Sequence, residues 1–440
     1  MLTWLGLATI AGVLVLILGR VTSVLVALTL VPVAAGLAGG FGSQVGVFAM
    51  EGIASVAPVA ALLAFAVVYF GVMNDAGLFD PAIAAVIRVV GRNPVRIALG
   101  TAAIATIAHL DGAGASTFMV TVPAMLPLYR QVGMSPIALT AIVALAAGTM
   151  NMLPWGGPTS RAAASLQVST ADLFVPAIPA LLAGMATVFL LAARIGRLER
   201  IRLGAPEDES PPGLDGGVAA LQSSGDVAAV ARGRSRPLWF FNATLTAVTL
   251  VALFVEAVPL AFVFLAASAV ALLVNYPDAR TQQERLGAHG TAAMLMVTTV
   301  LAAGVLTGIL TKSGMLGSLA ADLVHVMPSG VLRHLPVVMG LASMPLSLAF
   351  DPDSFYFGLL PVVAQASEAA GGSAVEVGRA ALLGQMTTGF PVSPLTPATF
   401  LLIGLAGVDL ADHQRTTIPY AFAVTAVMTA VAVATGALGL

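Results

Sequence analysis

Long apolar runs, separated by short charged segments, constrain the fold of this chain more than any other feature. Charged residues make up only 9% of its 440 residues, whereas a soluble domain carries about 25%. A membrane-spanning helix needs about 20 predominantly apolar residues, and runs of that kind recur from the first residues to the last. We therefore predict an all-α polytopic membrane protein, because so few polar groups could not cover a surface that faces water.

Several classes of function are excluded by what the sequence lacks. There is no cysteine, which rules out thiolate metal ligands and thiol catalysis. We find no hydrolase triad, no nucleotide-binding loop and no basic nucleic-acid patch. An enzyme, an ATP-driven pump and a nucleic-acid partner are therefore not expected, and we predict no permanently bound cofactor. A transport function would have to draw its energy from an ion gradient.

The predicted spans divide into two similar halves. Residues 1–193 form the first half and residues 238–440 the second, each with five spans and one re-entrant hairpin. Residues 194–237 are rich in arginine, proline, glycine and serine, which is typical of a flexible linker. An odd number of spans per half inverts the second half relative to the first, and inverted repeats are common in secondary transporters.

Positive charge predicts the orientation of the spans. If the linker lies in the cytoplasm, only Lys312, Arg333 and Arg379 fall outside, and every other cation except Arg161 falls inside. This is the expected excess of basic residues on the cytoplasmic side. We therefore predict a protein of the cell (inner) membrane with a cytoplasmic linker and both termini extracytoplasmic.

Each half also contains two short apolar pieces around a polar tip. The first pair spans about 97–130, with its tip at 111–114, and the second spans about 333–367, with its tip at 351–354. The pieces are too short to cross a bilayer comfortably. We therefore predict a re-entrant hairpin in each half.

Proline and glycine interrupt one span in each half. The broken spans are 136–168 and 377–407, and their breaks fall at 154–159 and 391–397, where a proline and a threonine recur at the same offset. Backbone groups freed at membrane depth are tolerated only inside protein or beside a water-filled cavity. Half-helix N-termini at such breaks present amides to anions. We interpret the two breaks as parts of one binding site rather than as simple proline kinks.

Three carboxylates, Asp111, Asp351 and Asp353, lie at the hairpin tips within otherwise apolar elements. A charged group at the bilayer centre costs about 2.5–3.5 kcal/mol on insertion scales, so it is usually functional. These carboxylates could carry a proton or coordinate Mg²⁺ or Ca²⁺. Helix capping is the alternative, and it fits Asp111 better than the closely spaced second pair.

Arg161 and His109 are the remaining ionisable candidates near the tips and breaks. The guanidinium of Arg161 could bind a substrate carboxylate or pair with Asp111. His109 could relay protons or serve as a structural hydrogen-bond donor. The groups that we predict to bind substrate are Gly112, Gly114, Ser116, Thr117, Gly156, Gly157, Pro158, Thr159, Arg161, Ser354, Ser393, Pro394, Thr396 and Pro397.

Long motifs surround these positions, such as NMLPWGGPTSR at residues 151–161 and AFDPDSFYFG at residues 349–358. Together with residues 69–81, 110–117, 125–129 and 393–399, they resemble the citrate–metal–proton symporter family (CitMHS). The similarity covers nearly the whole chain apart from the linker. It implies import of citrate complexed with a divalent metal ion, Mg²⁺ or Ca²⁺, in symport with protons.

The resemblance also places the chain in the ion-transporter superfamily. That superfamily implies a homodimer in the lipid bilayer with elevator-type movement. Sodium-coupled relatives bind sodium at Ser-Asn-Thr hairpin tips, whereas the tips here read 114-GAST-117 and 351-DPDS-354, which favours proton or metal contact. The alternatives are a proton- or sodium-coupled carrier of a free di- or tricarboxylate or another small anion, and a channel.

Overall fold

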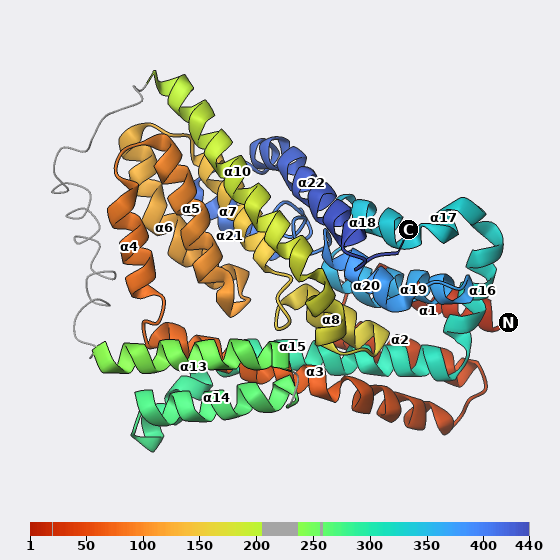
Figure 1. Cartoon of the computed structure of the whole chain (residues 1–440). Coiled ribbons are helices and arrows are strands. Elements are labelled where there is room, and N and C mark those ends of the chain that lie inside the picture. Colours follow the sequence, from red (N-terminus) through yellow and green to blue (C-terminus); the bar gives the residue numbers. More distant parts are fainter. Residues whose placement is uncertain (20, 205–235, 256–257, 440) are drawn as a thin grey trace.

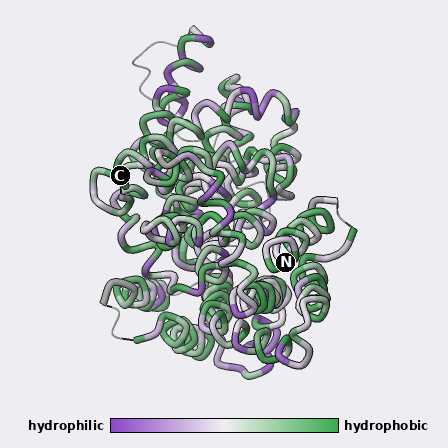
Figure 2. Tube along the Cα trace, turned by 90° about the vertical axis from the view of Figure 1, so that its right-hand side faces the viewer, coloured by the Kyte–Doolittle hydropathy of each residue, from purple (hydrophilic) through white to green (hydrophobic). Residues whose placement is uncertain are grey.

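Helices account for all regular secondary structure in the residues that the computed structural model describes, which are 1–19, 21–204, 236–255 and 258–439. In this part of the chain, four helical stretches are long and apolar enough to cross a membrane: Gln44–Asp75, Thr170–Leu203, Ala279–Lys312 and Leu410–Ala434. Shorter apolar helices accompany them, and Figure 2 shows hydrophobic residues on most of the helical turns. The predicted all-α class is confirmed.

Two long helices, α3 (Gln44–Asp75) and α15 (Ala279–Lys312), pack together along one side of the molecule (Figure 1). Glycines make this packing possible. A Cβ atom on Gly52 would overlap the carbonyl oxygen of Gly304 and lie 2.8 Å from the Cα atom of Gly308. Small residues of this kind let membrane helices approach backbone to backbone.

Shorter helices pack on this pair in a crossed pattern. Helix α2 (Val24–Ala38), from the first half, packs on α15, whereas α14 (Leu260–Asn275), from the second half, packs on α3. Helix α1 (Leu2–Leu18) contacts α2, and α13 (Arg236–Val255) contacts α14 in the same way. Each half therefore supplies a helix that packs on the long helix of the other half.

The other helices lie on the side of the long pair that faces away from α14 in Figure 1. Those of the predicted hairpins are α5 (Pro94–Ala108), η1 (His109–Asp111), α6 (Gly114–Val132), α18 (Leu335–Leu346), η3 (Ser354–Leu359) and α19 (Leu360–Ala369). Those of the predicted broken spans are α7 (Pro136–Met150), α8 (Gly157–Leu166), α20 (Ala374–Leu382) and α21 (Pro397–Ala406). Also present are α4 (Asp80–Val90), α9 (Thr170–Phe174), η2 (Val175–Ala177), α10 (Ile178–Leu203), α16 (Met315–Val326), α17 (Ser329–Arg333) and α22 (Leu410–Ala434).

One boundary differs from the prediction. Helix α10 continues to Leu203, although we expected the linker to begin at residue 194, and α13 begins at Arg236. The arginines of the last turn of α10 suit a helix C-terminus, where cations interact favourably with the helix dipole. Most of the predicted linker, residues 205–235, lies outside the described residues.

Candidate functional site

Both predicted interruptions are present in the structure. Helix α7 ends at Met150 and α8 begins at Gly157, while α20 ends at Leu382 and α21 begins at Pro397. We call the intervening segments, 151–156 and 383–396, the first and second breaks. Most residues in both are buried, so their freed backbone groups have to find partners within the protein.

The first hairpin tip and the two breaks meet at Asn151. Its amide Nδ2 donates a hydrogen bond to the carbonyl oxygen of Met386 over 2.7 Å, and its Oδ1 lies 3.3 Å from Nε2 of His109. Close by, the rings of Phe118 and Phe390 stack with their centroids 6.1 Å apart. Segments from both halves of the chain therefore converge on one polar cluster, as the interpretation of the breaks requires.

His109 is fully buried and is held from both ring nitrogens. Nδ1 lies 2.8 Å from the hydroxyl of Thr117, and Nε2 faces Asn151. Because Oδ1 of Asn151 can only accept, Nε2 carries the hydrogen. When the ring is neutral, Nδ1 is an acceptor that shares the Thr117 hydroxyl hydrogen with the Ala113 carbonyl oxygen, 3.0 Å from that hydroxyl. The structure thus shows His109 as a structural hydrogen-bonding residue, and the proton relay stays a prediction.

Asp111 folds the first hairpin tip. Its Oδ1 accepts a 2.8 Å hydrogen bond from the backbone N–H of Ala113, and its Oδ2 accepts one from the hydroxyl of Ser116. Gly112, between Asp111 and Ala113, has a left-handed φ of 72°, which a residue with a Cβ atom seldom adopts. Trp155 of the first break donates from Nε1 to the carbonyl oxygen of Leu110 over 2.9 Å, which joins this tip to the break.

At the second tip the two carboxylates do different things. Asp351 accepts hydrogen bonds from the backbone N–H groups of Asp353 and Ser354, at 2.9 and 3.0 Å, and from the Ser354 hydroxyl at 2.6 Å. Asp353 instead accepts from Nε of Arg161 over 2.7 Å. Of the two roles expected for Arg161, pairing with Asp111 is therefore wrong in this structure, and binding of a substrate carboxylate stays a prediction. Of the three carboxylates, Asp111 and Asp351 have the capping role, because each accepts a hydrogen bond from the main-chain N–H group two residues further along the chain.

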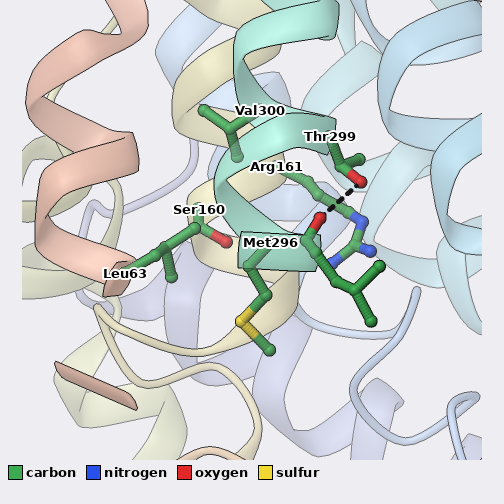
Figure 3. A pocket seen from close by; sticks show the side chains of 7 residues that line it. Leu63, Ser160, Arg161, Met296, Thr299 and Val300 are labelled. Carbon is green, nitrogen blue, oxygen red and sulfur yellow. Dashed lines mark hydrogen bonds between the residues drawn. The ribbon is translucent and has the colours of Figure 1, made fainter. Parts of the chain in front are cut away.

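Arg161 borders a cavity of about 150 Å³ between three helices (Figure 3). Helix α8 contributes Ser160 and Arg161, and α15 contributes Thr299 among others. The hydroxyl hydrogens are used locally, since Ser160 donates to the carbonyl oxygen of Gly157 and Thr299 to that of Leu295, each over 2.9 Å. The complete lining is Leu63, Ser160, Arg161, Leu295, Met296, Thr299 and Val300. The guanidinium makes this cavity suitable for an anionic group.

The remaining predicted residues mostly satisfy the broken backbone. Thr159 donates to the carbonyl oxygen of Met152 over 2.8 Å, and Ser393 donates to that of Ser347 over 2.5 Å. Pro158 and Pro397 lie in the first turns of α8 and α21, where proline is well tolerated. Of the residues predicted to bind substrate, Arg161 lines the cavity. The part of the lining that α15 supplies was not predicted, because nothing in the apolar sequence of this helix distinguishes Met296 or Thr299.

Helix α22 supplies two residues that the sequence did not indicate as part of the site. Nε2 of His413 donates to the carbonyl oxygen of Pro391, and Nε2 of Gln414 donates to that of Val392, both over 2.8 Å. His413 is fully buried and also contacts the hydroxyl of Thr140 on α7 over 3.1 Å. These contacts satisfy two carbonyl groups that the second break leaves without helical partners.

We expect the substitution His413→Leu to destabilise the protein by about 1–3 kcal/mol, because it leaves the buried Pro391 carbonyl without a donor. His413→Gln, which can restore an N–H donor, should recover part of the loss. Thermal melting of the purified protein in detergent measures both. The exposed His325, which hydrogen-bonds the Ala321 carbonyl oxygen of its own helix, provides the control His325→Leu. Equal melting temperatures for the two leucine variants would contradict a positioning role for His413.

The carboxylates do not form a metal site by themselves. In the described part of the chain, no group of three or more histidine, aspartate or glutamate side chains lies close enough together to hold a metal ion. Asp111, Asp351 and Asp353 thus do not combine as a set of three ligands. The site has instead a guanidinium that lines a small cavity and is paired with a carboxylate, that of Asp353.

A helical membrane protein with two interrupted helices beside this charged pair has the form of a solute carrier. Its fold is similar to that of the Alcanivorax borkumensis YdaH transporter, with a TM-score of 0.61 at 16% identity over 90% of this chain and 88% of that one. The Neisseria gonorrhoeae protein MtrF, described as one of a class of antimetabolite efflux pumps, has the same TM-score at 12% identity over 90% and 85% of the two chains.

Sequence comparison identifies the family. The family model CitMHS, described as citrate transporter, matches residues 13–388, and the chain belongs to this family. Two relatives come from Bacillus subtilis (strain 168): a citrate transporter, 42% identical over 99% of both chains, and a Mg²⁺/citrate complex secondary transporter, 38% identical over 100% of both. The resemblance inferred from the motifs is confirmed, and the family and these relatives are transporters rather than enzymes.

Proposed function

We propose that this protein imports citrate as its complex with a divalent metal ion, of the Mg²⁺ or Ca²⁺ class, in symport with protons. The observation that carries the proposal is the Arg161–Asp353 pair, which places a cation and an anion of the protein 2.7 Å apart at the edge of the cavity. A metal–citrate complex has the complementary character, because it presents free carboxylate oxygens together with a divalent cation. The 38% identity to a Mg²⁺/citrate complex transporter supports the same substrate.

Charge favours the complex over free citrate at this site. Trivalent citrate with one divalent cation is a monoanion, and one co-transported proton makes it neutral. Moving a charge from water into a low-dielectric site is costly unless it is paired. A chelate therefore needs fewer compensating groups than three free carboxylates would. It also brings ligands for its metal ion, so a complete set of protein ligands is not required.

The membrane arrangement belongs to the proposal as well. We assign residues 1–193 and 238–440 to two inverted repeats, and the crossed packing of α2 on α15 and α14 on α3 supports that assignment. We further propose a homodimer in the cell membrane, with extracytoplasmic termini and a cytoplasmic linker. In an elevator-type cycle, the broken helices would move relative to α3 and α15, since the cavity lies between α8 and these two helices.

Uptake of labelled citrate tests the substrate and the coupling together. Cells expressing the protein should accumulate citrate when Mg²⁺ or another divalent cation is present, and a chelator such as EDTA or a protonophore should abolish this. Accumulation that ignores divalent cations would point instead to a carrier of free di- or tricarboxylates. Uptake that survives the protonophore but requires sodium would contradict proton symport.

A further inference from the structure

The Arg161–Asp353 contact uses only part of each group. Nε of Arg161 donates to Oδ1 of Asp353 over 2.7 Å, and Nη1 reaches the Gly157 carbonyl oxygen over 3.3 Å. A guanidinium has five N–H donors, so donors remain for a further acceptor. Among the described residues, Oδ2 of Asp353 accepts no hydrogen bond. Arg161 lines the cavity, and both side chains of the pair are partly exposed, at 18% and 17%, so neither is sealed within the protein.

Asp351 provides a direct contrast in the same loop. Both of its oxygens are occupied by the tip itself, through two backbone N–H groups and the Ser354 hydroxyl. It cannot leave these partners without unfolding the start of η3. Asp353 is the carboxylate of this tip whose side chain can change partners while the loop keeps its shape.

We infer that, in the empty carrier, the Asp353 carboxylate occupies the position on Arg161 that a substrate carboxylate takes when citrate binds. This exchange of partners on Arg161 would make the divalent cation of the substrate complex obligatory. A citrate carboxylate takes over the guanidinium, and the released Asp353 carboxylate then faces the bound metal ion of the complex. Free citrate would instead leave Asp353 unpaired against a trianion. Removing the partner of a buried charge is strongly unfavourable, so the free anion is rejected. This inference rests on the proposed function and names Asp353 as the residue that sets the requirement for a cation.

Equilibrium binding to the purified protein in detergent tests the exchange. The quantity is the cation preference: the dissociation constant of citrate with EDTA divided by that of citrate with excess Mg²⁺. We expect Asp353→Asn to lower this preference by about tenfold, which corresponds to about 1.4 kcal/mol. Asp351→Asn keeps the Oδ1 acceptor for the two backbone N–H groups and loses only the acceptor for the Ser354 hydroxyl, so it should lower the melting temperature but leave the preference unchanged. Glu51→Gln, which removes a half-exposed pair with Lys312, is the control for loss of one carboxylate elsewhere.

The outcomes separate this inference from the proposed function. If the wild-type protein shows no cation preference, the metal–citrate substrate itself is contradicted. If the wild type prefers the complex and Asp353→Asn keeps that preference, or if Asp351→Asn alone loses it, the exchange is wrong while the substrate stands. Should Asp353→Asn not accumulate in membranes, Asp353→Ser is neutral and smaller, and the same ratio applies to it.

Discussion

Replacing Gly52 by alanine is expected to destabilise the protein by about 1–3 kcal/mol, the usual cost of overpacking. The added methyl group would collide with the Gly304 carbonyl oxygen and lie 2.8 Å from the Gly308 Cα atom. Backbone atoms cannot rotate away as a side chain can, so α3 and α15 must separate along their crossing. Melting of the purified protein and its amount in membranes measure the effect.

Gly46 provides a matched control on the same helix. A Cβ atom there meets nothing within 4 Å, and the residue is exposed. Because alanine is favoured over glycine inside helices by about 0.5–1 kcal/mol, Gly46→Ala should be neutral or slightly stabilising. Equal melting temperatures for the Gly52→Ala and Gly46→Ala proteins would mean that α3 and α15 are not packed as described.

Replacing Asn151 by leucine is expected to reduce citrate uptake to the background level at equal membrane abundance. The change leaves the Met386 carbonyl oxygen and Nε2 of His109 without their partners, at about 1–3 kcal/mol for each buried group. Because Asn151, in the first break, contacts both the first hairpin and the second break, its loss disturbs the relative position of these segments as well as stability. The initial rate of labelled citrate uptake measures the effect on transport.

Asn151→Asp divides this effect into its parts. The carboxylate keeps an acceptor for His109 but offers no donor to Met386, so its uptake should lie between the wild-type and leucine values. Asn74→Leu, which replaces an exposed amide near the end of α3, is the control for losing an amide elsewhere. Normal uptake by Asn151→Leu would show that contact between the hairpin tip and the second break is not needed for transport.

Sequence reasoning located the interrupted helices and the tips because proline, glycine and buried charge leave local signals. Pro158 and Pro397 each open a half-helix, and Asp111 and Asp351 each fold a tip. These features depend on residues close together in the chain. A single sequence is enough to predict them.

Long-range partners could not be predicted in this way. From the sequence, Asp111 is the expected pairing partner of Arg161, whereas the packing of η3 against α8 brings Asp353 to it instead. His413 follows a short loop and reads as a surface residue, yet the second break buries it. Thr299 lies in a featureless apolar run, and its place at the cavity depends on how α15 crosses α8.

The glycine contact between α3 and α15 has a consequence for how the protein can move. With the Gly52, Gly304 and Gly308 backbones touching, the two helices meet backbone to backbone, and a shift along each other would bring side chains into a contact that only glycine fits. The pair is thus suited to be the stationary frame of the carrier. In the proposed cycle, Arg161 would travel with α8, and Thr299 would be the fixed wall against which the loaded cavity opens to one side of the membrane and then the other.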